Sequence, residues 1–366
     1  MGFTCGIVGL PNVGKSTLFN ALTSTAQAEA ANYPFCTIEP NIGRVSVPDE
    51  RLDKIAALSK SARIVPTFLD FADIAGLVRG ASKGEGLGNQ FLGHIREVDA
   101  VIHVLRCFED ENVTHVEGRI DPIADAETVE TELMIADLES LERRADALGK
   151  KAKGGDRDAK AQLELMELAL GALRNGKPAR TAKVAPDRLR EWRGLQLLTS
   201  KPVLYVCNVE ESAAAAGNAL SAKVAAWAET QGAGCVTIAA AIESEVAQID
   251  DPAERKDFLE SMGLKETGLA RIIRAGYALL SLITFFTSGP KESRAWTVPA
   301  GAKAPEAAGA IHTDFERGFI RAEVVSYDDF VQYNGEAGAK DAGKWRLEGK
   351  DYIVKDGDVI HFRFNV

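Results

Sequence analysis

The chain has 366 residues, of which 46% are hydrophobic and 26% charged, an ordinary balance for a globular protein of two or three domains. No apolar run approaches the roughly 20 residues that cross a bilayer, so we expect no membrane-spanning segment. The net charge of −10 argues against nonspecific nucleic-acid binding by the whole surface. Five scattered cysteines without C-x-x-C spacing argue against a zinc site or a disulfide framework and for a reducing cytoplasm.

The first chemical motif is Gly9-Leu-Pro-Asn-Val-Gly-Lys-Ser16, which fits the phosphate-loop pattern G-x-x-x-x-G-K-[ST]. An apolar run predicts a buried strand over Phe3–Val8, and residues 17–22 predict a helix after the loop. This order lets backbone N–H groups surround phosphates. Lys15 would reach the β- and γ-phosphates, and the Ser16 hydroxyl would bind Mg²⁺. The loop residues expected to hold a nucleotide are Asn12, Val13, Gly14, Lys15, Ser16 and Thr17.

Short apolar runs alternate with helical stretches, which predicts a mostly parallel α/β sheet. Ligands bind at the carboxyl ends of the strands in such sheets, and the motifs fall at those ends. The runs are Phe3–Val8, Arg44–Val47, Thr67–Ala72, Ala100–Leu105, Val203–Cys207 and Cys235–Ile238. We expect residues 1–120 and 201–283 to form this nucleotide-binding domain, with its last helix over about Gly268 to Leu282.

The segment Asp73-Ile-Ala-Gly76 follows the strand predicted to end at Ala72 and fits the D-x-x-G pattern of a γ-phosphate sensor. Its acid can hold Mg²⁺, and the Gly76 N–H can bind the γ-phosphate. Thr37 can place its hydroxyl on Mg²⁺ and its backbone N–H on the γ-phosphate. Glycine-rich residues 80–88 can be ordered by the γ-phosphate and released afterwards. The expected metal ligands are Ser16, Thr37 and Asp73.

Leu77 stands where many switch GTPases place a glutamine that orients the attacking water. Because leucine cannot hydrogen-bond water, either hydrolysis is slow or another group positions the water. Asn12 could bring in a monovalent cation such as K⁺ near the phosphates. His115 is either a second candidate or an ordinary loop residue. We interpret Arg79 as a solvent-exposed loop residue.

The segment Asn208-Val-Glu-Glu211 follows the strand 203–207, where a guanine-specific domain carries N-K-x-D. The aspartate of that pattern accepts hydrogen bonds from two adjacent donors of guanine, a pair that adenine lacks. The Asn208 amide can instead pair with the N6/N7 edge of adenine. Val209 in place of the lysine and Glu211 in place of the aspartate weaken the guanine pattern. We therefore expect ATP to be preferred, without excluding GTP.

Residues 121–200 are predicted to form a helical hairpin inserted in the nucleotide-binding domain. Two stretches carry apolar residues at helical spacing, with a break at Gly154-Gly155 between them. The seams are Met134, Leu138, Leu141, Ala145 and Leu148, and then Leu163, Met166, Leu170 and Leu173. Residues 109–139 hold 11 acids and one arginine, whereas residues 141–193 hold 14 bases and 8 acids. Either the basic part meets RNA or an acidic partner, or the hairpin is simply solvated.

From Thr284 to Val366 the chain changes to short strands and turns, enough for a small independent domain. Residues 352–354 and 359–364 flank Lys355-Asp-Gly-Asp358, which predicts a β-hairpin. The segment holds 11 bases and 13 acids, so its net charge gives no affinity for RNA.

Together these motifs resemble the YchF-type Obg-like ATPases, a branch of the switch-GTPase superfamily. The resemblance covers essentially the whole chain. It rests on the phosphate loop with Asn12, on Asn32-Tyr-Pro-Phe-Cys-Thr37, on the segment from Asp73 to Gln90, and on Asn208–Glu211. The tail, with the segment from His312 to Ala322, resembles the family's TGS domain, a ubiquitin-like β-grasp fold. The hairpin resembles the family's coiled-coil insert.

The resemblance implies a cytoplasmic Mg²⁺-dependent ATPase that hydrolyses ATP to ADP slowly and associates with ribosomes. A family histidine proposed to help hydrolysis falls at the place of His115, and Asn208 and Glu211 match the family's N-x-x-E pattern for base recognition. We expect a monomer whose catalytic residues are Lys15, Asp73, Gly76 and His115.

Three functions stay open from the sequence. The first is an ATP-driven conformational switch with a ribosomal partner. The second is a nucleotide-gated binding protein with negligible turnover, which Leu77 favours. The third is a GTP-specific translational GTPase, which Asn208–Glu211 opposes.

Overall fold

In the computed structural model, residues 3–30, 42–74, 87–110 and 119–365 are described. The chain divides into two compact units. The larger unit contains Phe3–Gly43 and Asp70–Gly276, and the C-terminal unit contains Arg44–Leu69 and Tyr277–Val366. Among the described residues, no helix combines the length and the apolar character that crossing a membrane requires.

A six-stranded sheet in the order β2-β4-β1-β5-β6-β7 forms the centre of the larger unit. From β4 to β7 the neighbouring strands run parallel, which confirms the predicted mostly parallel α/β sheet. Every residue of β5 is buried, as expected for a parallel strand covered on both faces. The strands are β1 (Thr4–Val8), β2 (Ile42–Ser46), β4 (Phe68–Asp73), β5 (Ala100–Arg106), β6 (Val203–Asn208) and β7 (Gly234–Ile238).

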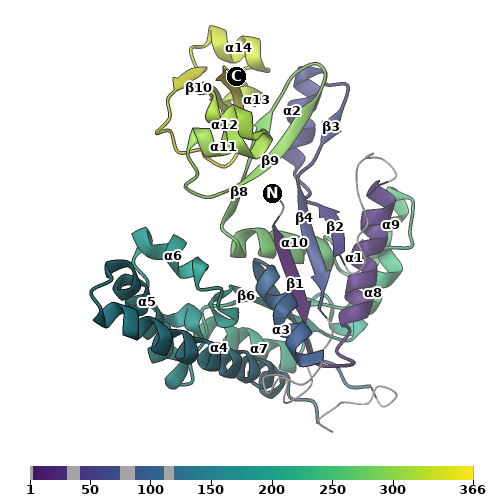
Figure 1. The fold of residues 1–366 in the computed structure, drawn as a ribbon. Coiled ribbons are helices and arrows are strands. Elements are labelled where there is room, and N and C mark those ends of the chain that lie inside the picture. The colour runs from purple at the N-terminus through teal and green to yellow at the C-terminus, as the bar shows by residue number, and fades with distance from the viewer. Residues whose placement is uncertain (1–2, 31–41, 75–86, 111–118, 366) are drawn as a thin grey trace. The chain divides into compact units, whose positions relative to one another are not determined.

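Helices follow the strands of this sheet (Figure 1). They are α1 (Lys15–Ala30), α3 (Leu87–Glu97), α7 (Ala219–Thr230), α8 (Ala240–Val246), α9 (Pro252–Ser261) and α10 (Gly268–Leu279). The buried Glu243 carboxylate caps α10 by accepting hydrogen bonds from the Gly268 and Leu269 N–H groups at 2.7 and 3.1 Å. Helix α10 ends at Leu279, before its predicted end, because Ser281 adopts a left-handed φ of 51° and Leu282 begins the next strand.

The predicted hairpin is confirmed as α4 (Pro122–Lys153) and α5 (Arg157–Arg174), which lie side by side in Figure 1. Asp121 and Asp156 are the N-cap residues of these two helices. Their carboxylates accept hydrogen bonds from backbone N–H groups of the first turns. Both predicted seams contribute to one apolar cluster. Trp192 of the short helix α6 (Leu189–Gly194) completes that cluster.

A buried carboxylate joins this hairpin to the segment that leads back into the sheet. Asp137 of α4 accepts hydrogen bonds from the N–H groups of Leu198 and Thr199 at 2.9 and 2.8 Å. It also accepts one from the Thr199 hydroxyl at 2.7 Å. Burial raises the pKa of Asp137, and these hydrogen bonds act in the opposite direction. The hairpin is therefore anchored by a polar contact as well as by its apolar seam.

The C-terminal unit is built on a mixed sheet in the order β11-β10-β12-β8-β9-β3. Strand β10 pairs antiparallel with β11 and β12, and β8 pairs antiparallel with β9. Strand β12 runs parallel to β8, and β3 runs parallel to β9. The strands are β3 (Ile64–Val65), β8 (Leu282–Thr287), β9 (Ser293–Pro299), β10 (Phe319–Ser326), β11 (Arg346–Glu348) and β12 (Asp358–Phe364).

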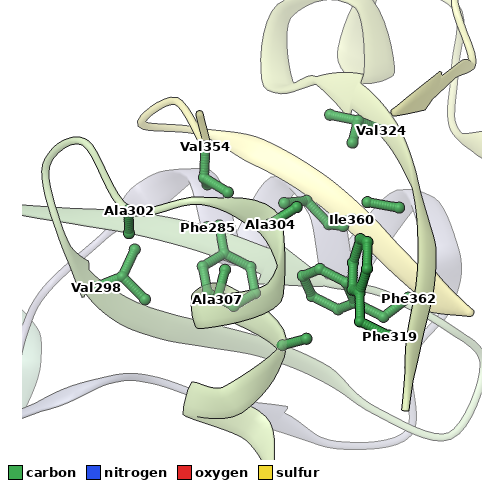
Figure 2. Close-up of a cluster of buried hydrophobic side chains, with 12 residues drawn as sticks. Phe285, Val298, Ala302, Ala304, Ala307, Phe319, Val324, Val354, Ile360 and Phe362 are labelled. Carbon is green, nitrogen blue, oxygen red and sulfur yellow. The ribbon is translucent and has the colours of Figure 1, made fainter. Parts of the chain in front are cut away.

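Apolar side chains cover both faces of this sheet. On one face, α11 (Ala304–Ile311) packs with strand residues in the cluster shown in Figure 2. That cluster includes Phe285, Val298, Ala304, Ala307, Phe319, Val324, Ile360 and Phe362. The opposite face packs against α2 (Glu50–Ser59), α13 (Tyr327–Gln332) and α14 (Glu336–Asp341), while α12 (Thr313–Arg317) follows α11. Its cluster is Leu52, Ile55, Phe286, Ala295, Val325, Phe330, Ala339 and Val359.

Two sequence predictions differ from this arrangement. The hairpin expected around Lys355–Asp358 is wrong: the turn forms, but β12 pairs with β10 and β8, and Ile353 bridges to Lys303. The predicted division at residue 284 also differs from the two units, because Arg44–Leu69 belongs to the C-terminal unit. Helix α2 from that segment buries its apolar side on the C-terminal sheet.

We expect Asp137→Ala to lower the free energy of unfolding by about 2 kcal/mol, because it leaves two buried N–H groups and a hydroxyl without an acceptor. Asp146→Ala, an exposed acid on the same helix, is the matched control and should change stability little. Urea unfolding of both variants measures the difference. Equal stabilities would show that Asp137 does not anchor the hairpin.

Candidate functional site

The phosphate loop between β1 and α1 closes around the Lys15 side chain. Its Nζ donates hydrogen bonds to the carbonyl oxygens of Gly9 and Leu10, each at 2.8 Å, and the residue is 9% exposed. Gly9 and Gly14 have φ values of +153° and +99°. A Cβ at Gly14 would lie 2.3 Å from the Asn208 amide nitrogen, so this position requires glycine.

The register of the sheet brings the other motifs to the same edge. Ile7 of β1 is paired with Asp73 of β4, and Arg106 of β5 is paired with Asn208 of β6. These residues end their strands or lie next to the end, so Asp73 and Asn208 lie at the same edge of the sheet as the loop that follows β1.

Asp73 and Lys15 act on each other electrostatically. Burial lowers the pKa of Lys15, and the charge of Asp73 opposes that shift. Burial raises the pKa of Asp73, and the charge of Lys15 opposes it. The Oδ1 atom of Asp73 is buried without a hydrogen-bond partner among the described residues. A buried carboxylate oxygen of this kind is suited to a cation or to a water held by one.

These residues fit a Mg²⁺ ion. The partnerless oxygen of Asp73 and the exposed Ser16 supply the hard oxygen donors that Mg²⁺ prefers. The described part of the chain contains no group of three His, Cys, Asp or Glu side chains that could hold a metal by itself. An ion here would therefore complete its shell with phosphate oxygens and water, as Mg²⁺ commonly does with nucleotides.

A cavity of about 510 Å³ opens beside the loop, within the size range of small-molecule sites. It brings together residues of the phosphate loop and Asn208, which the sequence predicted as parts of one nucleotide site. Its lining residues are Asn12, Gly14, Lys15, Ser16, Thr17, Phe108, Asp110, Asn208, Ala240 and Ala241.

Asn208 joins the loop to the far wall of this cavity. Its Nδ2 donates to the Val13 carbonyl at 3.0 Å, and its Oδ1 accepts from the Ala240 N–H at 2.9 Å. The side chain is therefore a structural clamp, and a purine can use only its remaining proton and lone pair. Val209 is buried in the core beneath, and Glu211 is exposed at the start of a short 3₁₀ helix outside the cavity lining.

Sequence reasoning missed Phe108 and Asp110, which line the cavity just after β5. The fully buried Arg106 positions them: its Nε donates to the Phe108 carbonyl and its Nη2 to the Asp110 carbonyl, each at 3.1 Å. The guanidinium also lies 4.7 Å from the centre of the Phe108 ring. Their place at the carboxyl end of a central strand was the signal that could have identified them.

The remaining predicted site residues are Val13 and a group that lies outside the described residues. Val13 is buried within the loop, and its carbonyl oxygen accepts the hydrogen bond from the Asn208 amide. Thr37, Gly76 and His115 lie outside the described residues, as do Leu77 and Arg79.

A phosphate loop between a parallel strand and a helix, an acid at the next strand end, and an asparagine clamp together define a P-loop nucleoside-triphosphate-binding protein. The pattern of a family described as "50S ribosome-binding GTPase" matches residues 4–137. The pattern of the YchF-GTPase_C family, described as a protein of unknown function, matches residues 282–365.

Relatives that match over the full length of the chain identify a particular family within this class of nucleotide-binding proteins. The "Ribosome-binding ATPase YchF" of Pasteurella multocida (strain Pm70) is 60% identical, and the protein of that name from Bacillus subtilis (strain 168) is 54% identical, with all of both chains covered in each case. The solved structure of the Schizosaccharomyces pombe YchF GTPase matches with a TM-score of 0.88 at 38% identity, over 99% of this chain and 98% of that one. The chain belongs to the YchF family.

We expect Asp73→Asn to stabilise the nucleotide-free protein by about 1 kcal/mol near neutral pH, because it removes a half-buried charge whose Oδ1 has no hydrogen-bond partner among the described residues. The folded-state pKa of Asp73 is raised, so wild-type stability from this group falls as pH rises above the ordinary carboxyl pKa. The variant should lack that fall. Thermal unfolding from pH 4 to 8 checks this, and a destabilised variant with an unchanged pH slope would contradict it.

We expect Arg106→Leu to raise the Kd for ATP about tenfold, because the loop that carries Phe108 and Asp110 loses two hydrogen bonds. Arg190→Leu, which removes an exposed arginine from the same unit, is the control. Titration of a fluorescent ATP analogue measures both. Unchanged affinity in a folded Arg106 variant would show that the loop does not need the guanidinium.

Proposed function

We propose that this protein hydrolyses ATP to ADP and phosphate and uses the nucleotide as a conformational switch on the ribosome. The observation that carries the proposal is the buried Lys15, which lines a cavity of nucleotide size and interacts electrostatically with Asp73, whose buried Oδ1 has no partner among the described residues. The relatives' names support both the ATPase activity and the ribosomal partner. We further propose that the protein acts as a monomer in the cytoplasm.

In this proposal the loop supplies electrostatic stabilisation rather than covalent chemistry. Lys15, already held on two carbonyl oxygens, would turn its charge toward the β- and γ-phosphates. Ser16, Thr37 and Asp73 would hold Mg²⁺, which supplies charge neutralisation at the phosphates when it is bound. The Gly76 N–H would contact the γ-phosphate.

The group that positions the attacking water is a separate part of the proposal. Leu77 cannot do so, and we propose His115 for this role. Asn12 lines the cavity in a left-handed conformation with φ of 64°, and we propose that it faces the phosphates. A K⁺ ion near Asn12 is the alternative source of stabilisation.

We propose that the preference for ATP depends on the segment after Asn208 and not on the Asn208 amide alone. The Asn208 amide is already bonded to two backbone groups, and N7, the acceptor it can still reach, is common to adenine and guanine. Discrimination then falls to the segment after Asn208. Val209 and Glu211 replace the lysine and the aspartate of the guanine pattern there.

The switch proposal gains support from the path of the chain between its two switch positions. Thr37 and Asp73 flank Arg44–Leu69, a segment that folds with the C-terminal unit. Within that unit, Arg51 of α2 pairs with Asp356 at 2.6 Å, and α2 buries Leu52 on the C-terminal sheet. Nucleotide-dependent movement at either switch would therefore be passed to this unit, which we propose to be a TGS domain over residues 284–366.

The end of the helical hairpin is the surface we propose for RNA. The last turn of α4 carries Lys150, Lys151 and Lys153, all exposed. Arg157 and Lys160 at the start of α5 are exposed as well. Basic side chains gathered at one end of a long hairpin suit phosphate contacts more than the solvated alternative does.

The direct test is nucleotide affinity followed by phosphate release, with and without ribosomes, for the wild type and Lys15→Ala. We expect ATP to bind more tightly than GTP, ribosomes to stimulate release, and the variant to lose turnover at least about a hundredfold. A preference for GTP would instead support the GTP-specific translational GTPase. Tight ATP binding without release under either condition would favour the nucleotide-gated binding protein.

Charge reversal at the hairpin end tests the RNA surface. The variant with Lys150→Glu, Lys151→Glu and Lys153→Glu should bind ribosomes more weakly, and its dependence of log Kd on log salt should be shallower by about two. Reversal of Lys303, Lys344 and Lys350, which are exposed on the C-terminal unit, is the control with the same charge change. Equal losses in both variants would reject a specific hairpin contact.

A further inference from the structure

Part of the C-terminal sheet exposes two arginines that face each other. In the register of β10 and β12, Arg321 is directly opposite Arg363, and Glu323 is directly opposite His361. On the other side of β10, Glu323 is opposite Leu347 of the edge strand β11. Antiparallel partners point to the same face, so these five side chains share one face of the sheet. We refer to them as the arginine face.

The arrangement of charges on the arginine face is not what the fold alone would favour. Like charges directly opposite each other destabilise an antiparallel pair. The Glu323 carboxylate forms ion pairs with both guanidiniums. Arg363 donates to its two oxygen atoms at 3.0 and 3.3 Å, and the Arg321 guanidinium lies 3.8 Å away. The pKa of Glu323 is lowered, first by the hydrogen bond from Arg363. One carboxylate thus holds two cations, which leaves an excess positive charge.

Neighbouring acids do not remove that excess. Glu336 of α14 also acts on Arg363, but it forms its own ion pair with Lys340. The Glu323 side chain is 10% exposed, whereas Arg321 and Arg363 are each 51% exposed. The carboxylate is therefore under the guanidiniums, and the surface that meets solvent is cationic.

An apolar side chain stands beside these cations. Leu347 is 63% exposed, the highest value among the large hydrophobic residues of the described chain. The other half of the same sheet face, including Val325 and Val359, is covered by α2 and α13. The arginine face is the other half, on which the Arg321, Leu347, His361 and Arg363 side chains are exposed. By the register, Leu347 lies on the edge strand opposite Glu323 and diagonal to Arg321. An exposed leucine beside cations is typical of an interface that combines an apolar contact with a polar rim.

We propose that the arginine face is a docking surface for an acidic protein segment that places an apolar side chain on Leu347 and carboxylates on Arg321 and Arg363. Two hydrogen bonds to Glu323 orient the Arg363 guanidinium, whose other edge can meet a carboxylate, and the Arg321 guanidinium lies 3.8 Å from one of the same Glu323 oxygen atoms. A nucleic acid fits less well. Leu347 offers nothing to a phosphate backbone, and residues 284–366 hold 13 acids against 11 bases. The surface is separate from the nucleotide cavity and does not depend on the ATPase proposal.

The test measures fluorescence anisotropy of a short labelled peptide in which glutamates alternate with leucines, added to the full chain. We expect saturable binding with a Kd below about 1 mM, weakened about fivefold by Arg321→Ser with Arg363→Ser. Lys303→Ser with Lys350→Ser removes the same charge elsewhere on the unit and should change the Kd less than about twofold. Replacing the peptide leucines by serine should also weaken binding.

The other outcomes overturn the proposal. A uridine oligonucleotide that binds more tightly than the peptide, and loses binding in the arginine variant, would assign the face to nucleic acid. No measurable peptide binding, or equal losses in the arginine and lysine variants, would leave the arginines as protection against strand-edge aggregation. Arg321→Thr should leave the melting temperature unchanged or raised, because it removes a like-charge pair. A clear fall would make the pair structural.

Discussion

The closure of the phosphate loop on the Lys15 ammonium is the constraint on which the rest of the site depends. A cation that is largely buried needs acceptors, and the loop provides them by turning the Gly9 and Leu10 carbonyls inward. That turn requires positive φ values at Gly9 and Gly14. The absence of a side chain at Gly14 in turn lets the Asn208 amide approach the loop.

The same closure ties the loop to three strand ends. Asn208 fastens the loop to the end of β6 and to Ala240 at the start of α8, while Asp73 stands at the end of β4 within electrostatic reach of Lys15. Arg106 at the end of β5 holds the Phe108 segment over the cavity. A nucleotide that draws the Lys15 charge toward its phosphates would therefore change the balance of forces at these three strand ends at once.

In the proposed switch, two strands would carry such changes out of the sheet. β2 and β4 each begin in one compact unit and end in the other, and Arg44–Leu69 between them folds with the C-terminal unit. Helix α2 is fixed there by Ile55 in the apolar cluster and by the pairing of Arg51 with Asp49 and Asp356. A segment this firmly packed would move with the C-terminal unit as one body.

The sequence allowed the phosphate loop and the buried strands around it to be predicted, because glycine spacing and apolar runs encode local backbone geometry. It did not show where α2 packs: Leu52 and Ile55 indicate a buried helix face but not its partner. The Lys355–Asp358 turn was recognised correctly, yet its arms pair with other strands, since the long β10 offers a better partner than residues 352–354. Phe108 has no motif, and its place in the cavity follows from the hydrogen bond that Arg106 donates to its carbonyl just after β5.

Asn208 illustrates a different limit. Its residue type fitted adenine recognition, and the same amide groups turn out to be bonded to Val13 and Ala240. A hydrogen-bonding side chain can satisfy a ligand or the backbone, and composition does not decide between them. Glu323 shows the converse, because only the strand register reveals that it is placed under two arginines.

The measurement that most directly tests the account is hydrogen–deuterium exchange of the full chain with Mg²⁺ and either ADP or a non-hydrolysable ATP analogue. If the nucleotide state is transmitted through Arg44–Leu69, exchange should differ between the two nucleotides in α2 and in the strands β8 and β12 that it packs on. Differences confined to Phe3–Gly43 and Asp70–Gly276, with the C-terminal unit unchanged, would contradict a switch that reaches beyond the nucleotide cavity.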